Sequence, residues 1–183
     1  MNYVLAELRD LPAIRQLMAK YHRDTIAPED MADGFVTTAL SDEQFADLIV
    51  RQRGVMLAKD GDTLAAFALA ASWEYWQQVP IMQRMIDLLP TMPAFEGITV
   101  TAQNTYQYGP VCVDKPYRGT GVFEEIFRAS LREYADKYPV MLTFVNQINP
   151  RSYAAHTRKA GMAELGTFDF NDNHYWMMAI KTK

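Results

Sequence analysis

The sequence contains one cysteine, no excess of positive charge and no hydrophobic run long enough to cross a membrane. Cys112 alone cannot form an internal disulfide or supply a zinc site. The 18 Lys and Arg against 22 Asp and Glu give a formal net charge of -4, so no global positive field attracts nucleic acid. Apolar stretches such as residues 64–71 fall far below the roughly 20 residues of a spanning helix. We therefore expect no metal, no nucleic acid partner and no membrane contact.

Segments that would divide or redirect the chain are also lacking. The residues after Met1 do not show the basic-then-apolar pattern of a secretory signal, which favours a cytoplasmic protein. No Ser/Gly-rich linker, repeat or low-complexity run interrupts the 183 residues, and 49% hydrophobic with 22% charged side chains is an ordinary globular composition. The length is close to the prior of about 150 residues for one domain. We predict a single domain over residues 1–183.

Apolar spacing in the first part of the chain predicts a short strand, two amphipathic helices and a hairpin. The first helix starts at Asp10 with Pro12 in its first turn, and the second starts at the N-cap residue Ser41. An Asp-Gly turn at Asp60-Gly61 joins two strand-like runs. The predicted ranges are a strand at 3–5, helices from 10 to 21 and from 41 to about 52, and strands at 55–58 and 63–71.

The second part of the chain predicts further helices that alternate with strands. The segment 73–93 has a helical apolar face and is interpreted as an inserted helix or lid. A kink or bulge is expected at Gly109-Pro110. The other predictions are strands at 98–108, 111–113 and 140–145, helices from 122 to before Pro139 and from 152 to 160, and a hairpin with a turn at 171–173 and a return strand at 175–180. Interleaved helices and strands indicate an α/β fold with a mixed sheet.

The most informative segment is Val113-Asp114-Lys115-Pro116-Tyr117-Arg118-Gly119-Thr120-Gly121-Val122. Here a strand ends, two glycines allow close approach of a ligand to the backbone, and a helix begins whose N–H groups and dipole favour an anion. The segment is not a dinucleotide fingerprint, because Glu124 stands where the third glycine belongs. No Gly-Lys-Ser/Thr follows, which excludes an ATP P-loop. The pattern predicts an anion cradle, and its alternative is a simple strand-to-helix turn.

The segment resembles the pyrophosphate loop of the GNAT superfamily of acyl-CoA N-acyltransferases, Val-x-Pro-x-Tyr-Arg-Gly-x-Gly-[Ile/Val]-[Gly/Ala]. The order of the predicted elements is also similar over nearly the whole chain. The resemblance implies a GNAT-like mixed, mostly antiparallel central sheet with a splayed strand pair, flanked by helices. The helical insertion at 73–93 would lie between the third and fourth strands.

The resemblance also implies an activity and a set of ligand contacts. Acetyl-CoA would be the co-substrate and lie between the strands at 111–113 and 140–145. The backbone of Val111, Cys112 and Val113 would meet the pantetheine, and Asn149 and Ser152 would touch it or cap their helix. Backbone N–H groups would hold the pyrophosphate, from Arg118, Gly119, Thr120, Gly121, Val122 and Phe123.

Two departures from the family pattern bear on these assignments. The last loop position is Gly or Ala in the family and Phe123 here, and we expect this ring to continue the apolar face of its helix with Ile126 and Phe127. The family often has an Asn, a small residue three positions after it, a Tyr or His seven positions after it, and a Gly four positions after that Tyr or His. Here Gly161 follows His156 by five, so counting from Gly161 points to Thr157 instead.

Acyl transfer to an amine requires a neutral amine, a donor for the thioester oxygen and a proton for the leaving thiolate. Tyr153 and His156 are equal candidates for the proton donor. A backbone N–H near residues 109–111 would hold the oxygen. Candidates for the base are Glu96, His174 and ordered water. Cys112 lies in an apolar run and is expected to be an inert thiol.

Aromatic residues gather in the insertion and the following strand, at Trp73, Tyr75, Trp76, Phe95, Tyr106 and Tyr108. Such density usually indicates core. Two alternatives are a wall of the acceptor site, with Met82 and Met85 beside it, and a homodimer interface. The leading hypothesis is an acetyl-CoA-dependent N-acetyltransferase that acts on a small amine or peptide amine. The alternatives are a catalytically silent acyl-CoA-binding module and a protein-interaction module that uses residues 73–93.

Overall fold

The computed structural model describes residues 1–183 apart from the side chains of Ala32 and Asp33. Its strands follow the hydrogen-bonded order β1-β2-β3-β4-β5-β7-β6. The pairs β1/β2, β2/β3, β5/β7 and β6/β7 are antiparallel, and the pair β4/β5 is parallel. The predicted α/β class with a mixed, mostly antiparallel sheet is therefore confirmed. The helices of the 73–93 segment lie between β3 and β4 in the chain, as expected.

Residue contacts divide the chain into two compact units. Unit 1 comprises Met1–Ala70 and Gly109–Ser130, and unit 2 comprises Ala71–Tyr108 and Leu131–Lys183. Strand β4 (Thr105–Val113) and helix α5 (Val122–Tyr134) each supply residues to both units. The single domain over residues 1–183 stays a prediction.

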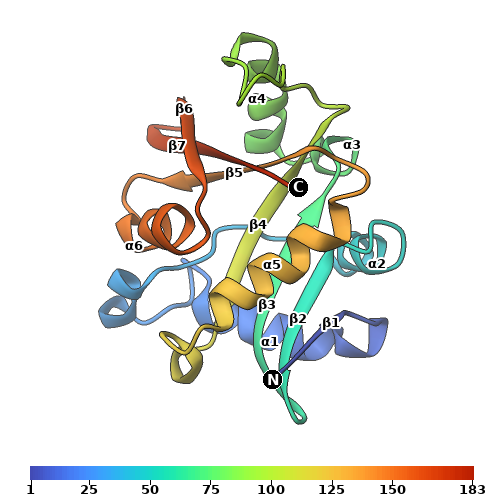
Figure 1. Cartoon of the computed structure of the whole chain (residues 1–183). Helices are drawn as coiled ribbons and strands as arrows, with labels where there is room; N and C mark the ends of the chain where they lie inside the picture. Colours follow the sequence, from blue (N-terminus) through green and yellow to red (C-terminus); the bar gives the residue numbers. More distant parts are fainter. The chain divides into compact units, whose positions relative to one another are not determined.

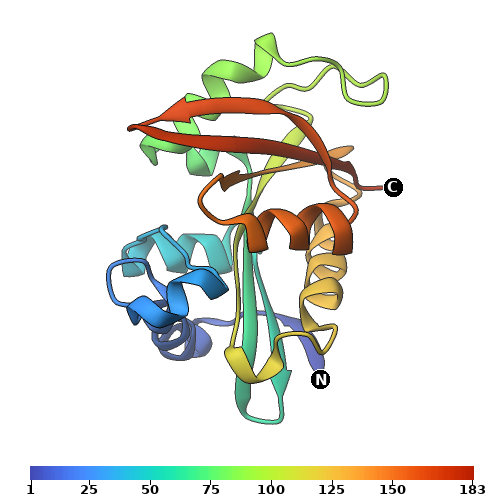
Figure 2. The ribbon, with the colours of Figure 1, turned by 90° about the vertical axis from the view of Figure 1, so that its left-hand side faces the viewer.

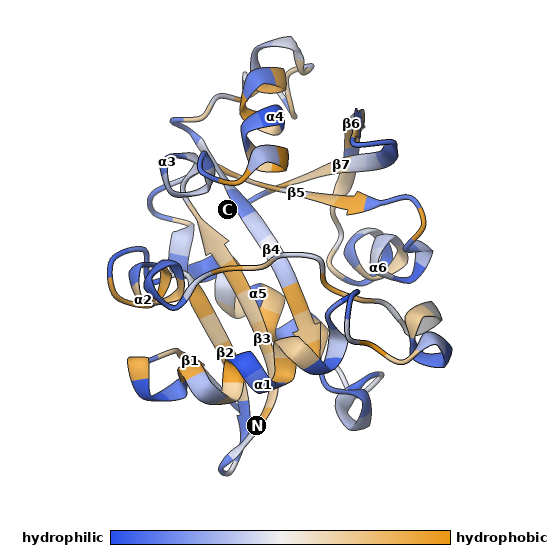
Figure 3. Ribbon diagram, turned by 180° about the vertical axis from the view of Figure 1, so that it is seen from behind, coloured by the Kyte–Doolittle hydropathy of each residue, from blue (hydrophilic) through white to orange (hydrophobic). Residues whose placement is uncertain are grey.

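Unit 1 is built on the strands β1, β2 and β3. Helices α1 and α2 cover one face of these strands, and the first part of α5 covers the other (Figures 1 and 2). Because both faces are covered, β2 and β3 are nearly continuous apolar strands (Figure 3). The bounds are β1 Asn2–Leu5, α1 Leu11–Tyr21, α2 Asp42–Val50, β2 Val55–Asp60 and β3 Thr63–Ala71, with 3₁₀ turns at Leu8–Asp10, Pro28–Asp33 and Lys115–Tyr117.

Local signals in unit 1 act as the sequence predicts. The Ser41 hydroxyl accepts a hydrogen bond from the Gln44 N–H at 3.2 Å, and the Gln44 side chain accepts one from the Ser41 N–H at 2.8 Å. This reciprocal capping box fixes the start of α2. Gly61 adopts a φ of 59° in the β2–β3 turn, a conformation that favours glycine. The positions of the helix start and the hairpin turn are thus confirmed.

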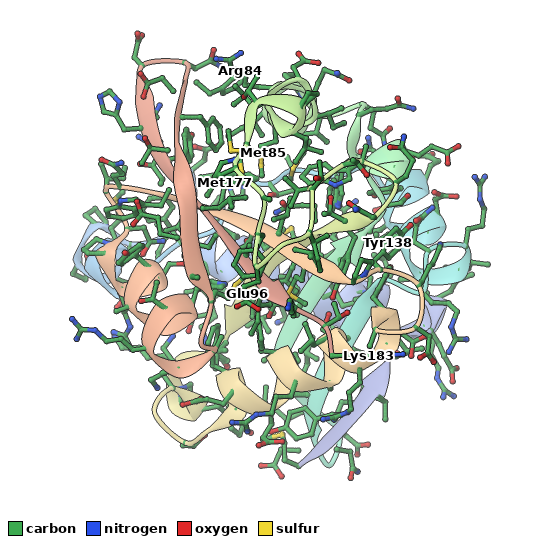
Figure 4. All side chains as sticks on the ribbon, turned by 45° about the horizontal axis from the view of Figure 1, so that its top comes forward. Arg84, Met85, Glu96, Tyr138, Met177 and Lys183 are labelled. Atoms are coloured by element: carbon green, nitrogen blue, oxygen red, sulfur yellow. The ribbon has the colours of Figure 1, made fainter. Side chains whose placement is uncertain are left out.

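Unit 2 is built on the start of β4 and on β5, β7 and β6. Helices α4 and α6 lie on opposite sides of the β6–β7 hairpin (Figure 2). Met85 of α4 lies beside Met177 of β7 in one apolar cluster (Figure 4). The bounds are α3 Trp73–Trp76, α4 Pro80–Leu88, a 3₁₀ turn at Leu89–Thr91, β5 Val140–Asn146, α6 Pro150–Ala154, a π-helical turn at Ala155–Lys159, β6 Ala163–Phe170 and β7 Asn173–Lys181.

The two faces of β4 carry different side chains within unit 2. Thr105 and Gln107 share one face, where the Trp73 Nε1–H of α3 donates to the Thr105 hydroxyl at 2.8 Å. We call this the α3 face. Tyr106 points to the other face, where its ring stacks on Tyr134 at a centroid distance of 4.6 Å. The side chains of the two faces are therefore held by different helices.

Three boundaries differ from the prediction. The strand expected at 98–108 begins only at Thr105, because the Asn104 side chain accepts a hydrogen bond from the Thr101 N–H at 2.8 Å and forms a local turn. The helix expected at 152–160 begins at Pro150 and ends in the π-helical turn. The strands expected separately at 98–108 and 111–113 belong to one strand from Thr105, because β4 continues through the cis Gly109-Pro110 bond.

The aromatic side chains of the insertion and of the segment that follows it are buried, together with Met82 and Met85. Their exposed fractions are 8% or less, for Trp73, Tyr75, Trp76, Met82, Met85, Phe95, Tyr106 and Tyr108. They form core, as such density usually indicates, and no exposed aromatic patch for a homodimer interface lies at these residues. The wall of the acceptor site stays a prediction. Among the described residues, no helix is long and apolar enough to cross a membrane.

Candidate functional site

The loop between β4 and α5 is shaped by two glycines in unit 1. Gly119 has a φ of 81° and Gly121 a φ of 87°, in the region that side chains other than glycine rarely adopt. A Cβ atom added at either residue would meet no other atom within 4 Å. The loop therefore presents open space over its backbone. The first N–H groups of a helix have no partner within the helix, so the start of α5 offers donors beside this space.

Tyr21 at the end of α1 holds the residues that precede the loop. Its hydroxyl donates to Asp114 Oδ1 at 2.7 Å and accepts from the Lys115 N–H at 2.8 Å. The Arg118 guanidinium lies over the Tyr21 ring at 4.5 Å, and Arg118 Nε donates to the Val113 carbonyl at 2.9 Å. One buried side chain thus fixes both ends of the turn that leads to the glycines.

The charges around the loop are balanced in pairs. Lys20 contacts Asp114 at 2.6 Å, and Lys115 contacts Asp30 at 2.6 Å. Burial acts to raise the pKa of Asp114, but hydrogen bonds from Lys20 and Tyr21 outweigh it and hold that pKa below its usual range. The carboxylate is therefore ionised and neutralised by Lys20 at neutral pH. An anion at the loop would meet a paired aspartate rather than an isolated negative charge.

The end of β4 carries the residues expected to meet the pantetheine. The Asp114 N–H donates to the Ala65 carbonyl of β3 at 2.8 Å. Backbone groups alternate along a strand, so those of Val111 and Val113 point to the opposite edge. The Val113 carbonyl on that edge already accepts the hydrogen bond from Arg118. Cys112 is buried, and burial raises the pKa of its thiol to about 12, so it is not a thiolate nucleophile at neutral pH.

The parallel pairing of β4 with β5 is short. It comprises Thr105 with Val140, Tyr106 with Met141 and Gln107 with Leu142. At the next residue, the Tyr108 carbonyl accepts from the Thr143 hydroxyl at 2.7 Å and from Gln107 Nε2 at 2.6 Å. The Thr143 side chain thus links the two strands where their paired register ends. The resemblance implies that the strand pair is splayed there.

Phe123 lies one residue into α5 and is half-buried. Its ring stacks on Phe127 at a centroid distance of 6.3 Å and an interplanar angle of 28°. Phe127 is one helical turn further on, so the Phe123 ring packs along the helix. This is the orientation in which the loop backbone stays accessible.

The start of α6 is stabilised by the residues that were expected to touch the cofactor. Asn149 Oδ1 accepts a hydrogen bond from the Ser152 N–H at 3.1 Å, which is N-cap geometry. The Ser152 hydroxyl lies 3.4 Å from His156 Nδ1. Both side chains have local structural roles, and their contact with a cofactor stays a prediction.

The π-helical turn accounts for the spacing between His156 and Gly161. The Ala160 N–H bonds the Ala155 carbonyl at 3.0 Å, five residues back, so one extra residue is absorbed before Gly161. The extra residue lies after α6, so the spacing counted from Asn149, which selects His156, is not disturbed by it. Thr157 donates its hydroxyl to the Tyr153 carbonyl at 2.9 Å and is bound within the helix.

The two proton-donor candidates lie in different surroundings. His156 is buried, its Nδ1 lies 2.8 Å from the Ser152 carbonyl, and burial lowers its pKa to about 4, so it is neutral at pH 7. Tyr153 is half-buried, packs on Trp176 and donates its hydroxyl to Glu164 at 3.0 Å. That hydrogen bond raises the pKa of Tyr153, which keeps its proton available.

The candidate bases each contact a polar side chain. Glu96 contacts Lys181 at 3.0 Å, and the exposed His174 contacts Asp169 at 2.5 Å. Both partners lie in unit 2. The choice between these residues and water stays open. Among the described residues, no group of three or more His, Cys, Asp or Glu comes together as a metal site would require.

No family model matches the sequence, and no curated protein sequence matches it. Solved structures do. The chain resembles smu.2055 from Streptococcus mutans UA159, with 15% identity, full coverage of both chains and a TM-score of 0.67. It is similar to yncA, a putative acetyltransferase from Salmonella typhimurium solved with acetyl-CoA, at 13% identity, 100% and 94% coverage and a TM-score of 0.67. It is also similar to the ribosomal-protein-S18-alanine N-acetyltransferase from Escherichia coli, at 14% identity, 100% and 94% coverage and a TM-score of 0.63.

The chain has the GNAT fold. The fold predicted from the motif and the element order is thereby confirmed. In this GNAT fold, the sequence singles out the loop from Arg118 to Phe123 as a candidate, and it does not single out Tyr21, Gln107 or Thr143. The helical spacing of Tyr21 marks it as core, and no local pattern distinguishes Gln107 or Thr143 from other residues of a buried strand.

Proposed function

We propose that the protein is an acetyl-CoA-dependent N-acetyltransferase that acts on a small amine or a peptide amine. The observation that carries this proposal is the loop of unit 1, where two glycines with positive φ open space beside the start of α5. Backbone N–H groups there suit the pyrophosphate of a coenzyme A thioester. The similar Salmonella protein solved with acetyl-CoA supports this choice of co-substrate.

The chain's own residues would divide the work as follows. The backbone from Arg118 to Phe123 would hold the pyrophosphate, and the outer edge of β4 at Val111 and Val113 would bind the pantetheine. Acetyl-CoA, when bound, supplies an acetyl thioester that is open to attack by an amine. A backbone N–H near residues 109–111 would stabilise the negative charge on the thioester oxygen.

Tyr153 is the better of the two proton donors. A phenol is protonated at neutral pH, and its hydrogen bond to Glu164 keeps it so. His156 is neutral because its pKa is about 4, so an imidazolium is not available there at pH 7. We assign Tyr153 to protonate the leaving thiolate and His156 to hold the helix through the Ser152 carbonyl.

Calorimetric titration tests the loop first. Acetyl-CoA should bind with a micromolar Kd, and affinity should fall with pantetheine, which lacks the pyrophosphate. Dephospho-CoA keeps the pyrophosphate and should bind better than pantetheine. Thiol release from acetyl-CoA with a panel of amines then tests the chemistry. Binding without thiol release would support the silent acyl-CoA-binding module, and the absence of binding would contradict the proposal.

A further inference from the structure

The Gln107 side chain of β4 is buried and only half satisfied. It is 2% exposed, and its Nε2 donates to the Tyr108 carbonyl at 2.6 Å. Its Oε1 accepts no hydrogen bond from the described residues. A buried acceptor without a donor is costly, and native proteins retain few of them, mostly where a ligand or water completes the site.

The orientation of this amide is fixed by its neighbours. A rotated amide would place Oε1 against the Tyr108 carbonyl, and two acceptors would then face each other. The Thr143 hydroxyl donates its one proton to the same carbonyl at 2.7 Å, so it has no proton left for a rotated Oε1. The amide nitrogen therefore stays on the backbone, and the amide oxygen is the group that needs a donor.

An apolar and aromatic cluster lies on the same face of the sheet as Gln107. Leu142 stands opposite it in the β4/β5 register, and Phe144 follows on the same side of β5. The Phe144 ring packs edge-on against Tyr175 at 5.6 Å, and Phe168 completes the cluster. Phe144 and Tyr175 are half-buried, so part of this aromatic cluster faces solvent.

We propose that Gln107 Oε1 is the binding group for the acceptor nitrogen, and that the acceptor is a primary amine on an aromatic or other apolar body. The inference rests on the proposed acetyltransferase function. An amide oxygen accepts an N–H from a neutral amine and, unlike a carboxylate, adds no negative charge that would favour the unreactive ammonium. The cluster of Phe144, Phe168 and Tyr175 would contact the apolar body. Gln107 is thus a positioning residue for the acceptor.

Two substitutions separate this role from a structural one. Gln107→Met keeps the size but removes both the donor and the acceptor, whereas Gln107→Glu removes the donor to Tyr108 and keeps an acceptor oxygen. The probe is 2-phenylethylamine, with putrescine as an amine that lacks an apolar body. Tyr106→Phe is the matched control, because the neighbouring Tyr106 hydroxyl is also buried and unsatisfied but lies on the opposite face.

The expected result is thiol release with 2-phenylethylamine at a lower KM than with putrescine. Gln107→Met should raise the KM for 2-phenylethylamine about tenfold, the loss of one hydrogen bond, and leave the Kd for acetyl-CoA unchanged. Tyr106→Phe should stay near the wild-type KM and kcat. Gln107→Glu should also keep the KM, because its carboxylate still accepts from the amine nitrogen, but it should lower kcat, because the carboxylate favours the unreactive ammonium. Equal effects of the Met and Glu variants on the KM would show a structural role and overturn the inference.

The proposed function and this inference fail in different ways. If thiol is released but the KM is insensitive to Gln107→Met, or putrescine is preferred, the inference is wrong and the acetyltransferase stands. If acetyl-CoA binds but no amine reacts, titration of 2-phenylethylamine into the complex with CoA decides. Binding that weakens in Gln107→Met supports the site, and no binding refutes it. Absence of acetyl-CoA binding refutes both.

Discussion

The loop after β4 and the helix after β5 are held in opposite ways. In the loop, the groups expected to bind are backbone N–H groups, and the side chains around them, Tyr21, Asp114 and Arg118, are engaged with each other. In the α6 segment, the expected functional groups are side chains, and Asn149 and His156 are engaged with their own helix. The loop proposed to bind the cofactor, the binding half of the site, is therefore organised before any ligand arrives. The proposed chemistry depends on Tyr153, whose hydroxyl lies near the surface.

Substitution of a loop glycine should produce the largest effect. Gly121→Ala places a methyl group in the open space over the loop and strains a φ of 87°, so we expect acetyl-CoA to bind about 100-fold more weakly by calorimetry. Gly61→Ala is the matched control, because Gly61 also has a positive φ and open space around it. Equal losses in the two variants would mean that general strain, not the loop, is responsible.

The second test compares the two proton-donor candidates by kcat. Tyr153→Phe removes only a hydroxyl and should lower kcat about 100-fold, with the Kd for acetyl-CoA unchanged. His156→Asn keeps a donor toward the Ser152 carbonyl and should change kcat by less than about threefold, because a neutral imidazole is not the acid. A larger fall in His156→Asn than in Tyr153→Phe would reverse the assignment.

Burial of His156 also predicts a stability that depends on pH. Its pKa is about 4 in the folded state against 6.5 ordinarily, so the unfolded chain takes up the proton first as the pH falls. The contribution of His156 to the free energy of unfolding is therefore complete above about pH 6.5 and is lost as the pH falls toward 4. Urea unfolding should show a loss of about 2 kcal/mol from pH 7.5 to 5 that is absent in His156→Asn. The exposed His174→Asn should keep the wild-type loss.

The sequence predicts the loop itself better than it predicts the distant side chains that hold the loop in place. Two glycines and a proline within Val113–Val122 restrict the backbone locally, and local restriction can be read without knowing the fold. Tyr21 contacts Asp114 across 93 residues, and its spacing in α1 marks it only as core. Such contacts exist only after packing.

The register after Asn149 illustrates the same limit. The spacing to Gly161 contains one residue too many for a regular α-helix, and it left His156 and Thr157 as alternatives. A π-helical turn absorbs that residue, and the choice depends on how His156 packs. The start of β4 at Thr105 shows the same limit. The alternation of residues 98–104 predicts a strand, but the local hydrogen bonds of Asn104 form a turn there instead.

Tyr21 provides a smaller effect that is specific to the binding half. Tyr21→Leu removes the ring beneath Arg118 and two hydrogen bonds to the turn, so acetyl-CoA should bind about tenfold more weakly. Pantetheine, which does not reach the loop, should bind as before. Tyr21→Phe keeps the ring, so its Kd for acetyl-CoA should lie between those of the wild type and Tyr21→Leu. Tyr138→Leu, another ring under a cation, is the control and should not alter either Kd.

Phe123 should give the smallest effect, because its ring packs along α5 against Phe127 rather than over the first N–H groups. Phe123→Ala should leave the Kd for acetyl-CoA within about threefold, at a cost of roughly 1 kcal/mol in stability for a half-buried ring. Phe123→Gly adds the helix penalty of glycine and should bind no more tightly. An increase in affinity above about tenfold in both variants would mean that the ring obstructs the loop. The binding half would then be less organised before the ligand arrives than its contacts imply, and the contrast with the α6 segment would disappear.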